Sequence, residues 1–220
     1  MLTPYDWQEG ISHRAQYAEA RLASGSPVLA ISRPDGILAL TYKGQSAKLF
    51  EIYDRIFMAA VGLQSDVEAI RVAAIDFAHQ EGFNRSEEDV TIQRLVSGLS
   101  ASIKRSFADF NSAPVIARTL FAEVGSTQAD DKFMILDFDG DFRNCASAAV
   151  AAGTVETGLQ LEEQLKKVDA SRLNTAIDAL DRIWQSQREE PDEDGSEYLT
   201  REIVLMERSD EHINRFRRME

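Results

Sequence analysis

The chain has 220 residues, of which 44% are hydrophobic and 28% charged, and its formal net charge is −13. That length supplies one full hydrophobic core and argues against a second large domain, so we expect a single domain over residues 1–220. The acidic balance argues against a general nucleic-acid binder, because neutralising phosphates requires clustered lysines and arginines.

The chain has a single cysteine, Cys145. One cysteine excludes an internal disulfide framework and a cysteine-based metal cluster, which favours a reducing compartment. No apolar run approaches the roughly 18 residues of a membrane span, and the N-terminus lacks the basic start and apolar centre of a signal peptide. We therefore expect a cytoplasmic protein.

The first predicted element is a helix over residues 6–24, where apolar residues recur at spacings of four, three and four. Asp6 can cap its first turn, and Gly25 can end it in a left-handed conformation. Because this helix precedes the first strand, we expect it to lie across the end of the domain, where it can meet a neighbouring subunit.

Two hairpins are predicted next. Residues 28–40 hold two apolar runs around Arg-Pro-Asp-Gly at 33–36, a sequence typical of tight turns. Residues 49–54 and 56–61 form the second pair, and Lys48 stands at its start. A capping pattern at 65–68 then predicts a helix ending at Gly82, and a second pattern at 86–89 predicts a helix that continues to about Asn111.

The second half of the chain is also predicted to have strands followed by two helices and then further strands. Strands are predicted at 115–124, 132–137 and 142–148, with a hairpin turn at 139–141, followed by helices at 155–168 and 171–187. The acidic segment 189–197 is expected to be a mobile loop, because its like charges repel and it lacks core residues. Strands at 198–207 and 214–219 complete the chain. This order predicts an α+β fold, a four-layer αββα sandwich with an extra N-terminal helix.

Several kinds of chemistry can be weighed from the residues. His13, His79 and His212 are scattered without metal-ligand spacing, so no metal site is expected. The acidic run at 137–141 lacks the later glutamate of a calcium loop and is better interpreted as a hairpin turn. No glycine-rich phosphate loop is present, and Cys145 is expected to be a buried thiol. We therefore expect no cofactor.

Nucleophilic chemistry is a further possibility, because a four-layer sandwich of this order is the architecture of N-terminal-nucleophile hydrolases. In such enzymes a residue freed at the start of the first strand attacks, and its own α-amine serves as base. Here cleavage before Ser26 would be required. Pro27 and the preceding helix argue against it, and Tyr42 occupies the place where these peptidases have a carboxylate.

The whole chain resembles proteasome α-type subunits, in particular those of actinobacteria. The resemblance lies in the helix around ISHRAQYAEARLASGSPV, in AKLFEIYDRIFMAAVG, in VEAIRVAAIDFAHQEGFNRSEEDVT and in the closing FRRM. It is most specific in the block at 51–55 with the following Gly62, and looser in the C-terminal half.

The resemblance implies a non-catalytic subunit of a threonine-type endopeptidase, the 20S proteasome core particle. Such subunits form heptameric rings that cap catalytic β-subunit rings, and their N-terminal residues gate the axial pore. By resemblance, the gate would comprise Met1, Leu2, Thr3, Pro4, Tyr5, Asp6 and Trp7. Lys48 would bind the C-terminal carboxylate of a ring-shaped ATPase activator that carries a hydrophobic-tyrosine tail. Two alternatives stay open: a self-processing peptidase using Ser26, and a stand-alone homo-oligomeric scaffold of this fold.

Overall fold

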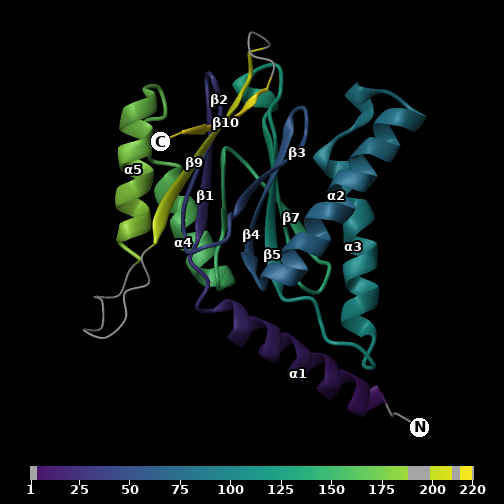
Figure 1. Cartoon of the computed structure of the whole chain (residues 1–220). Coiled ribbons are helices and arrows are strands. Elements are labelled where there is room, and N and C mark those ends of the chain that lie inside the picture. Colours follow the sequence, from purple (N-terminus) through teal and green to yellow (C-terminus); the bar gives the residue numbers. More distant parts are fainter. Residues whose placement is uncertain (1–3, 188–198, 210–213, 220) are drawn as a thin grey trace.

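The computed structural model describes residues 4–187, 199–209 and 214–219. Two five-stranded sheets stack face to face, and a pair of helices covers the outer side of each sheet (Figure 1). This is the four-layer αββα sandwich that the element order predicts. The extra helix α1 (Pro4–Leu22) lies across one end of the layers (Figure 1).

Sheet A has the strand order β10-β9-β2-β1-β8, and every neighbouring pair is antiparallel. Its strands are β1 (Val28–Arg33), β2 (Gly36–Lys43), β8 (Ala148–Ala151), β9 (Thr200–Glu207) and β10 (Phe216–Met219). The predicted first hairpin is confirmed as β1–β2, with Arg33 paired to Gly36 across the turn. β2 is central because the distant strand β9 pairs along its whole length.

Sheet B has the order β3-β4-β5-β6-β7 and is also antiparallel throughout. Its strands are β3 (Leu49–Tyr53), β4 (Ile56–Gly62), β5 (Ala117–Glu123), β6 (Lys132–Leu136) and β7 (Phe142–Cys145). The predicted turn at 139–141 is confirmed: Asp137 N–H donates to Asp141 O at 2.9 Å, and Gly140 takes a φ of 87°.

The remaining helices are α2 (Gln64–Asn84), α3 (Ile92–Ala108), α4 (Val155–Leu165) and α5 (Leu173–Gln185), with short 3-10 helices at Glu87–Asp89 and Gln128–Asp130. Three apolar clusters hold the layers together: one between the sheets, one beneath α2 and α3, and one beneath α4 and α5. Trp184 of α5 anchors the third cluster, and its Nε1–H donates to Pro27 O at 2.8 Å. No helix among the described residues is long and apolar enough to span a membrane.

Both predicted capping patterns are wrong in detail. α2 begins at Gln64, one residue before Ser65, and its N-cap Leu63 has no side-chain cap bond. Backbone contacts decide this start, because Leu63 N–H donates to Ile116 O at 2.9 Å and the Asp66 carboxylate accepts from Ile116 N–H at 2.7 Å. The pattern at 86–89 forms only a 3-10 turn, and Thr91 caps α3 instead.

Other predicted element boundaries also differ from those in the structure. The first helix begins at Pro4 and ends at Leu22, earlier than the predicted 6–24 at both ends. The single strand predicted at 142–148 is two strands, because the chain leaves sheet B after Cys145 and enters sheet A at Ala148. The predicted acidic loop at 189–197 lies outside the described residues.

Candidate docking pocket

Lys48 lines an open pocket of about 780 Å³ at the β3 edge of the sandwich. The loop before β3 (44–48) forms one wall, and Ala60 and Gly62 of β4 form the floor beside it. Gln64 and Val67 of α2 and Thr200 of β9 complete the lining. Gly62 is required in the floor, because its φ is 150° and a Cβ there would lie 2.1 Å from Ile116 O. The pocket therefore depends on backbone that passes very close to the neighbouring strand.

The Lys48 ammonium group is directed to the start of β1. Its Nζ donates to Ser26 O at 2.7 Å and also to Ser26 Oγ. Burial lowers the pKa of Lys48 from 10.5 to about 8, while the nearby Glu202 carboxylate opposes part of that shift. The lysine is therefore mostly protonated at neutral pH, although its charge is only partly compensated.

Sequence reasoning missed the part played by Glu202 of β9. This buried carboxylate accepts from the backbone N–H of Lys48 at 2.9 Å and pairs with Arg218 of β10. Lys43 Nζ lies 4.0 Å from it. Glu202 thus links β10 and the loop before β3 to the pocket, and an acid placed directly before the apolar run 203–206 of a predicted strand is the signal that could have indicated it.

The surroundings of Ser26 argue against peptidase chemistry. Its Oγ donates to the Tyr42 carbonyl oxygen at 3.0 Å, which is not a base, and accepts from the Lys48 ammonium, which is mostly protonated at neutral pH. Tyr42 does occupy the place at the end of β2, but its OH is directed to Asp181 Oδ1 at 2.5 Å. Burial, followed by this hydrogen bond, raises the pKa of Tyr42. The structure brings Ser26 and Lys48 together without a catalytic carboxylate.

The residues of the expected gate divide into two groups. Met1, Leu2 and Thr3 lie outside the described residues. Pro4, Tyr5, Asp6 and Trp7 form the first turn of α1. Tyr5 is 83% exposed, whereas the Trp7 ring packs edge-on against Phe110 with the ring centres 4.8 Å apart.

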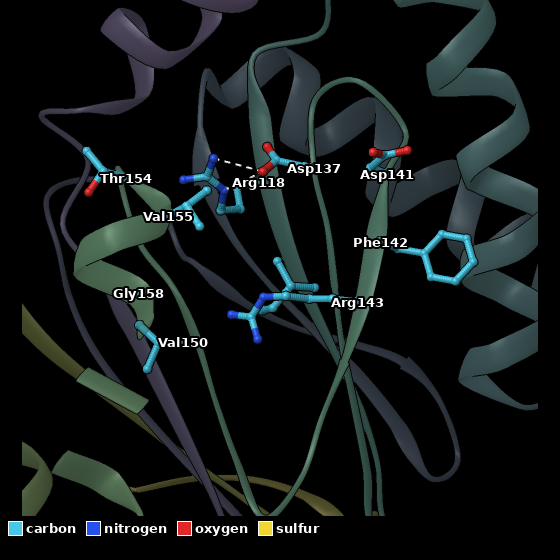
Figure 2. Close-up of a pocket in the computed structure, with 10 residues that line it drawn as sticks. Arg118, Asp137, Asp141, Phe142, Arg143, Val150, Thr154, Val155 and Gly158 are labelled. Atoms are coloured by element: carbon cyan, nitrogen blue, oxygen red, sulfur yellow. Dashed lines mark hydrogen bonds and ion pairs between the residues drawn. The ribbon is translucent and has the colours of Figure 1, made fainter. Parts of the chain in front are cut away.

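A second pocket, of about 260 Å³, opens between β6, β7 and α4 (Figure 2). Arg118 reaches into it and pairs with Asp137 at 2.8 Å, as Figure 2 shows. Arg143 crosses the gap to pair with Glu162 of α4. These four charged groups are therefore paired with one another in and beside the pocket.

The sequence predicts no metal site and a buried thiol at Cys145. Within the ranges that the structure describes, no group of three histidine, cysteine or acidic side chains could hold a metal ion. Cys145 is half buried beside Glu162, and burial together with that carboxylate raises the pKa of its thiol to about 12. The thiol is therefore unreactive at neutral pH.

Comparison with known proteins supplies the family. The profile described as "Proteasome subunit" matches residues 24–189. The chain is 36% identical to the proteasome subunit alpha of Pseudarthrobacter chlorophenolicus over 65% of this chain and 61% of that protein. It is 35% identical to the one from Arthrobacter sp. strain FB24, over 80% of this chain and 84% of that protein. For the one from Streptomyces avermitilis, identity is 28% over the whole chain and 87% of that protein. The chain belongs to the proteasome subunit family and is an α-type member of it.

Proposed function

We propose that this chain is a non-catalytic α-ring subunit of a bacterial 20S-like proteasome core particle in the cytoplasm. It assembles with copies of itself into a ring, caps a ring of catalytic β subunits, gates substrate access and docks an ATPase activator. The observation that carries the docking role is the position of Lys48, a half-buried lysine with a desolvated ammonium group that lines an open pocket.

Lys48 has the chemistry needed to recognise a chain terminus. Its ammonium group is partly desolvated, so a carboxylate placed in the pocket gains a charge-assisted hydrogen bond. The pocket lining also includes the apolar residues Ala47, Ala60 and Val67, against which a hydrophobic and a tyrosine side chain can pack. A pKa of about 8 adds a second expectation: docking weakens above pH 8, as the lysine loses its proton.

The gating role is the part of the proposal that α1 supports. This helix, whose first turn holds four of the expected gate residues, lies across the end of the sandwich (Figure 1). Tyr5 is almost fully exposed on the first turn of that helix and is available to contact other subunits.

The test is Lys48→Ala in the assembled core particle, with Lys132→Ala as the matched control. Lys132 is an exposed lysine in β6 that pairs with Glu123, far from the pocket. We expect Lys48→Ala to reduce ATPase-stimulated degradation at least tenfold, with ring assembly and small-peptide hydrolysis unchanged. Undiminished stimulation would remove Lys48 from the docking role.

The two alternatives give different results in intact-mass and native mass spectrometry. A chain that begins at Ser26 after purification would indicate self-cleavage and a peptidase. Ring-sized particles that never incorporate a β subunit would indicate a stand-alone scaffold. An unprocessed chain in a particle with β subunits supports the α-ring proposal.

A further inference from the structure

A buried carboxylate on a distant strand lies behind the Lys48 pocket. Glu202 of β9 points into the space between the sheets, because Val204 and Met206, at alternate positions of the same strand, belong to the apolar cluster packed there. The Glu202 side chain is only 4% exposed. A charge so far removed from water is costly unless cations and hydrogen-bond donors surround it. The partners of Glu202 therefore decide how this charge acts on its neighbours.

Glu202 and Arg218 of β10 hold two consecutive backbone units at the start of β3. One Glu202 oxygen, Oε2, accepts from the Lys48 N–H at 2.9 Å, and the other, Oε1, pairs with the Arg218 guanidinium. Arg218 also donates from Nη2 to Leu49 O at 3.0 Å. Its guanidinium lies 5.5 Å from the centre of the Phe216 ring, which fixes its position further. The ion pair thus fixes the backbone from which the Lys48 side chain extends.

One carboxylate serves three cations at this corner of the molecule. Besides Arg218, Lys43 Nζ lies 4.0 Å from Glu202. Burial lowers the pKa of Lys48, and the Glu202 charge opposes part of that shift. Asp66, the acid in the first turn of α2, instead accepts from a backbone N–H just before β5 at 2.7 Å. The charge of Lys48 is therefore only partly compensated, which leaves it attraction for an incoming carboxylate.

The two members of the ion pair act on Lys48 with opposite sign. The Glu202 carboxylate stabilises the protonated ammonium, whereas the Arg218 guanidinium weakens that effect by neutralising the carboxylate. Among the described residues that line the pocket, Lys48 is the only charged one. Glu202 and Arg218 are not part of that lining, so they influence an anion in the pocket through Lys48.

We propose that Glu202 and Arg218 are positioning residues for the docking site at Lys48. Together they fix the backbone of residues 48–49, while Glu202 keeps the ammonium in its charged form and Arg218 limits that effect. The inference rests on the proposed docking role and adds the residues that control its charge. A purely structural ion pair would weaken docking whichever partner is removed. This pair instead shifts the pH dependence of docking in opposite directions.

The test replaces each charge separately. Glu202→Gln keeps an oxygen acceptor for the Lys48 N–H and removes the negative charge, so we expect the midpoint of the Lys48 titration to fall by about half a pH unit or more. Arg218→Gln removes the positive charge, and we expect the midpoint to rise by a similar amount. Two controls should leave it within about 0.2 unit: Arg218→Lys, which keeps the charge, and Arg217→Gln on the same strand, whose arginine pairs with Glu207 at 2.9 Å.

The titration is measured on the assembled core particle by competitive acetylation between about pH 6.5 and about pH 10. Mass spectrometry of the resulting peptides reports each of the six lysines of the chain separately, so the other five serve as internal references. A thermal melt of each variant verifies that it folds. Because the Arg218 side chain is 51% exposed, its variant gives the sign of the effect even where Glu202→Gln does not fold.

Docking is measured over the same pH range with a peptide that ends in a hydrophobic-tyrosine segment and a free carboxylate, and with its C-terminal amide. We expect the pH of half-maximal binding of the free acid to follow the Lys48 midpoint in each variant, and the amide to bind about tenfold more weakly. Midpoints that stay in place, or that move in the same direction in Glu202→Gln and Arg218→Gln, overturn the positioning roles. Equal binding of acid and amide by the wild type overturns docking at Lys48 itself, whatever the midpoints do.

Discussion

The lowered pKa of Lys48 predicts a specific pH dependence of stability. We consider Lys48→Met, which keeps an unbranched side chain of similar length and removes the charge. In the wild type the folded-state pKa is about 8 and the unfolded value is 10.5. Between these values the unfolded chain binds a proton that the native chain does not, so the free energy of unfolding rises with pH.

The magnitude follows from the shift. At about 1.4 kcal/mol for each pKa unit, the buried charge costs about 3 kcal/mol at pH 7.5 and below. That cost disappears as the pH rises towards 10.5, and about 2 kcal/mol of it is gone by pH 10. Loss of the Nζ contacts to Ser26 adds a destabilising offset in the variant that does not vary with pH.

The assay is urea unfolding of both proteins at pH 7.5 and at pH 10, followed by circular dichroism under conditions that keep the assembly state equal. Lys132→Met, at a lysine whose side chain is 54% exposed, reports the effect of removing one surface charge. We expect the wild type to gain about 2 kcal/mol relative to Lys48→Met over this range. A difference that stays constant with pH would refute the assignment of a desolvated ammonium.

Two further predictions concern the scaffold of the pocket and the thiol. Gly62→Ala should cost more than about 3 kcal/mol or abolish soluble expression, because its Cβ would lie 2.1 Å from Ile116 O. Gly44→Ala, with no atom within 4 Å of the added Cβ, should change the midpoint of thermal unfolding by less than about 2 °C. Cys145 should react with iodoacetamide at pH 8 at least about 100-fold more slowly in the native protein than in urea, because its pKa is about 12. Equal rates would show that the thiol is not held in its protonated form.

The layers of the fold could be predicted from the sequence because their signals are local. The turn before Gly36 and the apolar stripe of α3 each depend on residues within a few positions of one another. Helix starts were predicted less well, since the start of α2 is decided by Ile116, some fifty residues away.

The pocket depends on such distant contacts almost entirely. Lys48 could be singled out only through a family resemblance, because nothing in its local sequence differs from a surface lysine. Its partner Ser26 lies just before β1, 22 residues away in the sequence, and its partner Glu202 lies in β9, 154 residues away. Only the folded arrangement shows that burial and the Glu202 carboxylate set the pKa of this lysine.

The strand order of the two sheets has a consequence for the way the chain folds. Sheet B is built from one continuous stretch, Leu49 to Cys145, so all its pairings can form once that stretch has left the ribosome. Sheet A instead pairs β2 with β9, and the partner of Gly36 is Glu207. Until residues 200–207 are synthesised, β2 presents an unpaired hydrogen-bonding edge rich in leucine and isoleucine, which is a template for aggregation. We therefore expect nascent chains that stall between residues 150 and 200 to hold a formed sheet B and to require a chaperone for the open side of sheet A.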